Sequence, residues 1–182
     1  TSITDVGLEN LRGMTTMQQL LLGSTKVTDQ GLENLKGMTG LQGLFLRGDT
    51  ITDKGLEHLK GMTDMQILNL TDTKITDTGL EYLSGMTEMQ SLFLAKTRIS
   101  DRGLEHLKDM NRLEFLDLEG TQVTDAGVQQ LVFQPLATAA PVGFDQVGVW
   151  ERPLRVLVQV LHVRVGRRRV YVEVILFDIF AV

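Results

Sequence analysis

Residues 41–64 read LQGLFLRGDTITDKGLEHLKGMTD, and this unit of 24 residues recurs along the chain without insertions. The motif Thr-Asp-x-Gly-Leu begins at Thr4, Thr28, Thr52 and Thr76, and it returns with one conservative change each at Ser100 and Thr124. The Leu-x-Leu pairs keep the same spacing, at Leu20/Leu22, Leu44/Leu46, Leu68/Leu70, Leu92/Leu94 and Leu116/Leu118. A fixed period of this length is typical of a solenoid, in which each unit packs only against its neighbours.

Each unit is expected to form a strand, a turn and a short helix. Because side chains alternate along a strand, Leu44 and Leu46 point one way and the residue between them points the other. The Thr52 hydroxyl is placed to cap free N–H groups of the helix, and the Asp53 charge suits the positive end of its dipole. Gly31 and its equivalents are expected to let the helix backbone approach the sheet closely. Stacked units would then share one continuous apolar core.

The pattern Leu41-x-x-Leu44-x-Leu46-x-x-Asp49-x-Ile51 resembles the leucine-rich repeat signature, and the Thr-Asp-x-Gly-Leu helix is similar to the 24-residue variety common in bacterial repeat proteins. The resemblance covers roughly residues 3–131. It implies a right-handed α/β solenoid with a parallel sheet on the concave face and short helices on the convex face. Where the family often has Asn, this chain has Thr25, Thr73, Thr97 and Thr121, with Asp49 as the exception. A Thr hydroxyl can bond the turn backbone, whereas the Asp49 charge must tilt outward or find a donor.

Composition and charge exclude several classes of site. The chain has no cysteine, which excludes disulfides, thiol catalysis and thiolate metal sites. A net charge of -5 argues against nucleic acid as the main partner, because phosphate binding needs clustered Lys and Arg. No run of about 18 apolar residues is present to span a bilayer. The chain starts at Thr1 without a leader, so we expect a processed product or a fragment, and the compartment is not identified by the sequence.

The repeat pattern covers residues 1–131 and then stops. A seventh unit would need Leu-x-Leu near positions that hold Ala140 and Val142. Residues 132–153 contain all three prolines and are expected to form a linker. Residues 154–182 are expected to hold a β-hairpin with strands at Val156–Val160 and Val170–Val174. This valine-rich tail is interpreted as a C-terminal cap, as part of another domain, or as the product of an altered reading frame.

The residues between and beside the two leucines of each strand are expected on the concave face. Five of them are apolar, namely Leu21, Phe45, Ile67, Phe93 and Phe115. Neighbouring strands lie about 4.8 Å apart, so these side chains are expected to form one patch of the kind that marks interaction sites. A polar rim is expected from Arg47, Asn69, Asp117 and Glu119. In the alternative interpretation, the apolar residues are merely scattered or the tail packs over them.

The convex side carries a column of acidic residues, at Glu9, Glu33, Glu57, Glu81 and Glu105. Lys36, Lys60 and Lys108 lie three residues beyond the corresponding Glu. The pattern predicts a solvated helix face with i,i+3 ion pairs, and a functional acidic stripe is the alternative.

No pattern in the sequence indicates catalysis, so we expect a protein that is not an enzyme and has no metal or cofactor. His58 and His106 occupy one helix column two repeats apart, roughly 10 Å, which is too far for two ligands of one metal ion. They are expected to be exposed helix residues. Neither a phosphate-binding glycine loop nor a nucleophile elbow is present.

The leading functional prediction is a module that binds a protein or peptide on its concave sheet face. The family resemblance implies concave binding, whereas the specific residues come from the strand phase. The alternative is a structural spacer or targeting arm, a fragment of a larger repeat protein, and a third hypothesis places an enzyme domain outside this segment. The open end of the first repeat also predicts self-association through the N-terminal end.

Overall fold

The fold was analysed in a computed structural model, which describes residues 3–48, 50–131, 155–165 and 168–178. The strands are β1 (Gln19–Leu21), β2 (Gly43–Phe45), β3 (Ile67–Asn69), β4 (Ser91–Phe93), β5 (Phe115–Asp117), β6 (Arg155–Val165) and β7 (Arg168–Asp178). The helices are α1 (Asp5–Glu9), α2 (Asp29–Leu32), α3 (Asp53–Glu57), α4 (Asp77–Glu81) and α5 (Asp125–Gln130), with 3-10 segments η1 (Glu33–Leu35) and η2 (Gly103–Leu107). None of the helices in these ranges is long and apolar enough to cross a bilayer.

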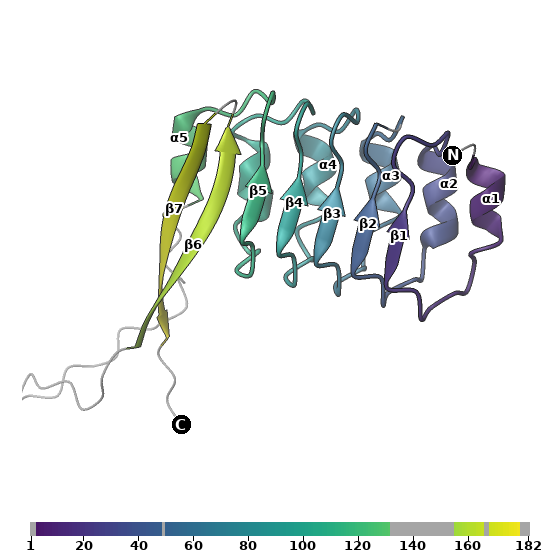
Figure 1. The fold of residues 1–182 in the computed structure, drawn as a ribbon, viewed down its shortest axis with the longest axis horizontal. Helices are drawn as coiled ribbons and strands as arrows, with labels where there is room; N and C mark the ends of the chain where they lie inside the picture. Colours follow the sequence, from purple (N-terminus) through teal and green to yellow (C-terminus); the bar gives the residue numbers. More distant parts are fainter. Residues whose placement is uncertain (1–2, 49, 132–154, 166–167, 179–182) are drawn as a thin grey trace, which may run out of the picture.

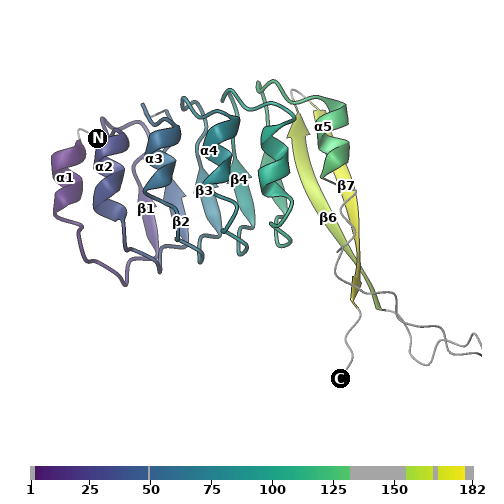
Figure 2. The same cartoon turned by 180° about the vertical axis from the view of Figure 1, so that it is seen from behind.

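The strands form one open sheet in sequence order, and the helices lie in a second layer behind it (Figure 1, Figure 2). Strands β1 to β6 run parallel, and β7 pairs antiparallel with β6. The register follows the 24-residue period, so that Leu20 pairs with Leu44 and Leu44 pairs with Leu68. The predicted α/β solenoid, with a parallel sheet on one side and short helices on the other, is therefore confirmed.

The core lies between the two layers and runs through every repeat. Leu44 and Leu46 are fully buried, together with Leu56 from the helix of the same repeat. Ile51, which follows the turn, is also fully buried. Because the same positions are apolar in each unit, the buried side chains join into one cluster from Leu8 to Val163. Burial of this kind contributes about 25 cal/mol per Å² of apolar surface, which makes stacking the main source of stability.

An Asp–Thr contact joins each repeat to the next. The Asp29 carboxylate accepts a hydrogen bond from the Thr52 backbone N–H at 2.7 Å and another from the Thr52 hydroxyl at 2.6 Å. The same pair of bonds recurs at the other junctions, Asp5–Thr28, Asp53–Thr76, Asp77–Ser100 and Asp101–Thr124. The expected capping by Thr is present at Thr52, whose hydroxyl accepts from the Lys54 N–H at 3.3 Å. The Asp therefore has a second role, between repeats, that the sequence alone did not indicate.

The glycine of each motif after the first makes room for that carboxylate. A Cβ atom on Gly55 would lie 2.5 Å from Asp29 Oδ1 and 3.0 Å from Ile51 Cγ2. Equivalent glycines face the preceding Asp in the same way, at Gly31, Gly79, Gly103 and Gly127. The prediction that these glycines bring the helix close to the sheet was wrong, because the close neighbour belongs to the helix of the preceding repeat.

The Thr residues at the turn bond the backbone, as predicted. The Thr73 hydroxyl donates to the Leu70 carbonyl at 2.6 Å, and the Thr97 hydroxyl donates to the Leu94 carbonyl at the same distance. Both side chains are buried, so these bonds satisfy hydroxyls that would otherwise be costly in the core. Each bond stays within its own repeat. The exception at this position, Asp49, lies outside the described residues.

The convex ion pairs predicted between Glu and Lys are absent among the described residues. No ion pair joins Glu33 to Lys36 or Glu57 to Lys60, and the same holds for Glu105 and Lys108. The helices are too short for this arrangement, since α3 ends at Glu57 and η1 ends one residue before Lys36. Outside the helices, in the segments that precede β4 and β5, an ion pair joins Arg112 to Glu88 of the preceding repeat.

The tail supplies two strands to the sheet, and β6 and β7 pair along eleven residues each. Strand β6 lies beside β5, where Val163 pairs with Leu116 and is 1% exposed. Backbone bonds run from the His162 N–H to the Glu114 carbonyl and from the Leu118 N–H to the Arg164 carbonyl. In the sheet, Val163 therefore takes the place beside Leu116 that a seventh repeat would fill with a residue near position 140. The expected linker, residues 132–153, lies outside the described residues, and the three interpretations of the tail stay predictions.

Candidate protein-binding face

The strand register arranges the concave residues in two rows across the sheet. One row contains Gln19, Gly43, Ile67, Ser91, Phe115 and His162. The second row contains Leu21, Phe45, Asn69, Phe93, Asp117 and Arg164. Side chains that share a row come from adjacent strands, so neighbours within a row lie close enough for contact.

Five apolar residues of these rows form a continuous stripe, here named the concave stripe: Leu21, Phe45, Ile67, Phe93 and Phe115. From β2 onwards they alternate between the two rows, so each one neighbours the next on the adjoining strand. The ring centroids of Phe93 and Phe115 lie 5.1 Å apart with an interplanar angle of 43°. Leu21 is 69% exposed, and the other four are partly buried. The apolar patch expected from the strand phase is therefore assembled on one face.

A glycine in the first row shapes the stripe at its second strand. Gly43 is buried, and a Cβ atom there would lie 3.5 Å from Phe45 Cε2 and 3.3 Å from Gln19 Cγ. The Phe45 ring thus lies along the strand over the glycine. A Cβ atom at position 43 would be in ordinary van der Waals contact with the ring and tighter against Gln19, so Gly43 underlies the stripe at this strand.

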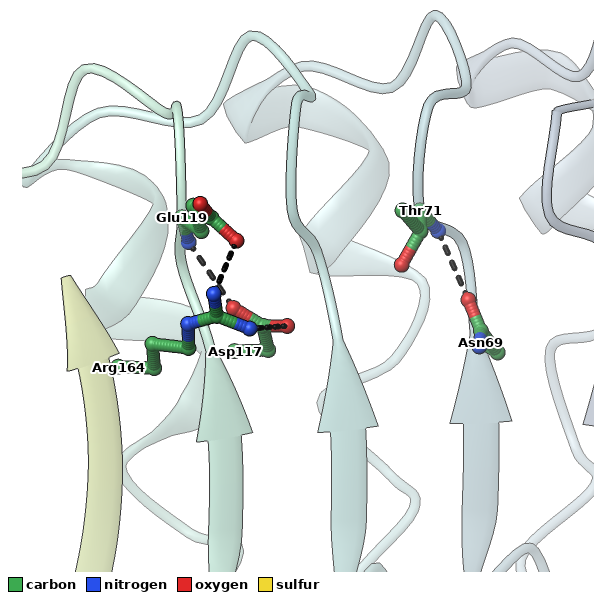
Figure 3. Close-up of polar contacts among 5 residues, drawn as sticks. All are labelled: Asn69, Thr71, Asp117, Glu119 and Arg164. Atoms are coloured by element: carbon green, nitrogen blue, oxygen red, sulfur yellow. Dashed lines mark hydrogen bonds and ion pairs between the residues drawn. The ribbon is translucent and has the colours of Figure 1, made fainter. Parts of the chain in front are cut away.

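Two side chains of the expected polar rim, Asn69 and Asp117, accept hydrogen bonds from nearby backbone N–H groups (Figure 3). Asn69 Oδ1 accepts from the Thr71 N–H at 3.0 Å, and Asp117 Oδ1 accepts from the Glu119 N–H at 3.1 Å. Asp117 is only 8% exposed. Both side chains close the turn that follows their strand, which is a structural role.

Arg164 of β6 reaches the two acidic residues at the end of the face (Figure 3). Its guanidinium lies 2.7 Å from Glu119 Oε2 and 3.9 Å from Asp117 Oδ2. The Arg164 side chain is 43% exposed and balances part of their negative charge. Arg164 was not among the residues expected on this face, because only the register of β6 against β5 places it in the second row. Arg47, at the other end of the rim, is exposed.

The histidines form no metal site in the described part of the chain. No group of three or more His, Asp or Glu side chains there lies close enough to hold a metal ion. His58 and His106 are partly buried, with Tyr82 at the same position of the repeat between them. The prediction that both residues are exposed was therefore wrong.

The period, the register and the buried leucines can be compared with known families. A family model described as Leucine Rich repeat matches residues 61–84 and 111–132. The 24-residue repeats of this chain are leucine-rich repeats. No curated protein sequence gives a significant match to the chain.

The fold is shared with a solved internalin structure, and two further structures are similar at lower TM-scores. An internalin, InlF, from Listeria monocytogenes is similar at 26% identity with a TM-score of 0.61, over 71% of this chain and 36% of that one. Internalin C2 of the same species is 20% identical with a TM-score of 0.49, over 72% and 74% of the two chains. A plant peptide hormone receptor, RGFR1, in complex with RGF2 is 16% identical with a TM-score of 0.49, over 71% and 20%. This chain thus spans about a third of the length of the first internalin.

Proposed function

We propose that this chain is a non-catalytic interaction module that binds a protein or peptide on the concave stripe of its leucine-rich repeats. The observation that carries the proposal is the concave stripe, in which apolar residues from Leu21 to Phe115 neighbour one another on successive strands. Exposed apolar surface that includes aromatic rings is a feature of interaction sites, and solenoids use their extended curved faces for such contacts.

The chemistry around the stripe supports a largely uncharged partner segment. The acidic residues at one end, Asp117 and Glu119, already share Arg164. Their side chains are held by bonds within the protein, so little ordering cost is added when a partner binds. Apolar contact is then the main source of affinity, and we expect binding that depends only weakly on salt.

A pull-down from the source organism's lysate with three forms of the chain tests the proposal. The forms are the wild type, a stripe variant (Phe45→Glu/Phe93→Glu/Phe115→Glu) and a convex control (Gln30→Glu/Thr78→Glu/Ala126→Glu). The control changes the net charge by the same amount at exposed helix positions. Circular dichroism shows whether each form is folded.

We expect the wild type and the convex control to retain a common partner that the folded stripe variant loses. Equal retention by all three forms would contradict the proposal and would place the site elsewhere. A chain that retains no partner in any form would favour the alternative prediction of a spacer or targeting arm.

A further inference from the structure

The two rows of the concave face repeat with a period of two strands. In the second row, Phe45 on β2 and Phe93 on β4 lie on either side of Asn69 on β3. All three side chains are partly buried. The first row has the same order of an apolar, a polar and an apolar side chain one strand later, at Ile67, Ser91 and Phe115. Each row therefore presents two apolar contacts with a polar group between them.

The polar group in the second row is a hydrogen-bond donor that the turn holds in place. Asn69 Oδ1 accepts from the Thr71 N–H at 3.0 Å, so the orientation of the side-chain amide is fixed (Figure 3). Asn69 Nδ2 forms no hydrogen bond with the described residues. A partly buried donor of this kind gains most when a bound ligand supplies an acceptor. The centre of the second row thus offers N–H groups to a ligand.

The charge of the face favours a neutral ligand. On strands β1 to β4, neither row contains a charged side chain. The first acidic residue of the rows is Asp117 on β5, and Arg164 lies beside it. A neutral surface with a fixed donor is complementary to a neutral chain that offers acceptors. A proline-rich backbone is such a chain, because proline has a carbonyl oxygen and no N–H group.

The period of the rows matches one type of backbone. Adjacent strands are about 4.8 Å apart, so the positions of Phe45 and Phe93 lie about 9.6 Å apart across the sheet. A polyproline II helix has three residues per turn and rises about 9.3 Å per turn. An extended strand instead repeats the same face about every 6.7 Å. Two turns of an α-helix rise about 10.8 Å, and its carbonyl groups are bonded internally, which leaves Asn69 without an acceptor.

We propose that the concave stripe binds a proline-rich segment in the polyproline II conformation, which runs across the strands. This inference rests on the proposed function, because it takes the concave stripe as the binding site. Ligand residues three apart contact Phe45 and Phe93, and a ligand carbonyl between them accepts from Asn69 Nδ2. Three lines of side chains run along a polyproline II helix, so two of them contact the two rows. The segment is already ordered before binding, which lowers the entropy cost.

Fluorescence anisotropy with a dye-labelled peptide of nine prolines tests the ligand class on the full chain. We expect saturable binding at chain concentrations up to about 1 mM. A Gly-Ser peptide of the same length is flexible and should bind much more weakly. Phe45→Ala/Phe93→Ala should weaken binding of the proline peptide about 30-fold, because it removes both aromatic contacts. Circular dichroism shows whether this variant is folded.

Asn69→Asp tests the donor without disturbing the turn. The Asp side chain retains the oxygen that accepts from Thr71 and loses the NH₂ group. The equivalent residue of the fifth strand, Asp117, already makes this turn bond, with the Glu119 N–H at 3.1 Å. We expect the proline peptide to bind about fivefold more weakly. The matched control, Asn111→Asp, makes the same change at an exposed turn and should bind like the wild type.

Three outcomes would overturn the proposal. They are no saturable binding of the proline peptide, equal binding of the Gly-Ser peptide, and unchanged binding by either folded variant. The lysate pull-down separates this failure from a failure of the proposed function. A partner that the wild type retains and the stripe variant loses, without binding of the proline peptide, would overturn the proline-rich ligand and leave concave binding in place.

Discussion

Replacing Gly55 by Ala should destabilise the chain through the Asp29 carboxylate of the preceding repeat. The new Cβ atom would lie 2.5 Å from Asp29 Oδ1, so the carboxylate must move and lose its two bonds to Thr52. Hydrogen bonds to a charged group contribute about 1.5–3 kcal/mol each. Ala gains about 1 kcal/mol over Gly in a helix. The expected net loss in the free energy of unfolding is therefore about 2–5 kcal/mol.

Urea denaturation monitored by circular dichroism measures this loss, and Gly85→Ala is the matched control. Nothing lies within 4 Å of a Cβ atom at Gly85, so we expect a change within about 0.5 kcal/mol there. A double-mutant cycle isolates the cause. In an Asp29→Ala background, Gly55→Ala should cost less than about 1 kcal/mol, because the carboxylate is gone. Equal costs in the two backgrounds, or a Gly55→Ala variant as stable as the control, would show that contact with the Asp29 carboxylate is not the cause.

Three further predictions concern the tail and the turns. Val163→Asp should release β6 from β5, because it buries a charge at a side chain that is 1% exposed, and amide hydrogen exchange of β5 should accelerate. Arg164→Ala should lower the free energy of unfolding by less than about 1 kcal/mol in urea denaturation, since its ion pairs are partly solvated. Lys96→Gly should raise the melting temperature, with a gain of about 0.5–1 kcal/mol, because Lys96 has a φ of 58°.

The repeat architecture was predictable because it depends on local patterns. Alternation in Leu44-Phe45-Leu46 sets which side chains enter the core, and the 24-residue period sets which strands are neighbours. The same two facts place Phe93 beside Phe115, which is why the concave stripe could be drawn from the sequence. Side-chain direction and strand order therefore required no long-range information.

Contacts between repeats, and contacts of the repeats with β6, could not be predicted from these local patterns. The role of Gly55 depends on where Asp29 of another repeat lies, which no single unit contains. The predicted ion pair between Glu57 and Lys60 is absent because the helix ends at Glu57. The repeat pattern does not determine where a helix ends. Arg164 was missed because the register of β6 becomes known only once Val163 is seen in the core.

Site-specific photo-crosslinking tests whether a partner binds on the concave stripe. A benzophenone amino acid at Phe93 keeps an aromatic ring on the concave stripe, and the same group at Thr78 lies on the exposed side of α4. With the partner retained by the wild-type chain, we expect a crosslink from position 93 and none from position 78. A crosslink from position 78 alone would contradict concave binding and would place the partner on the convex helices.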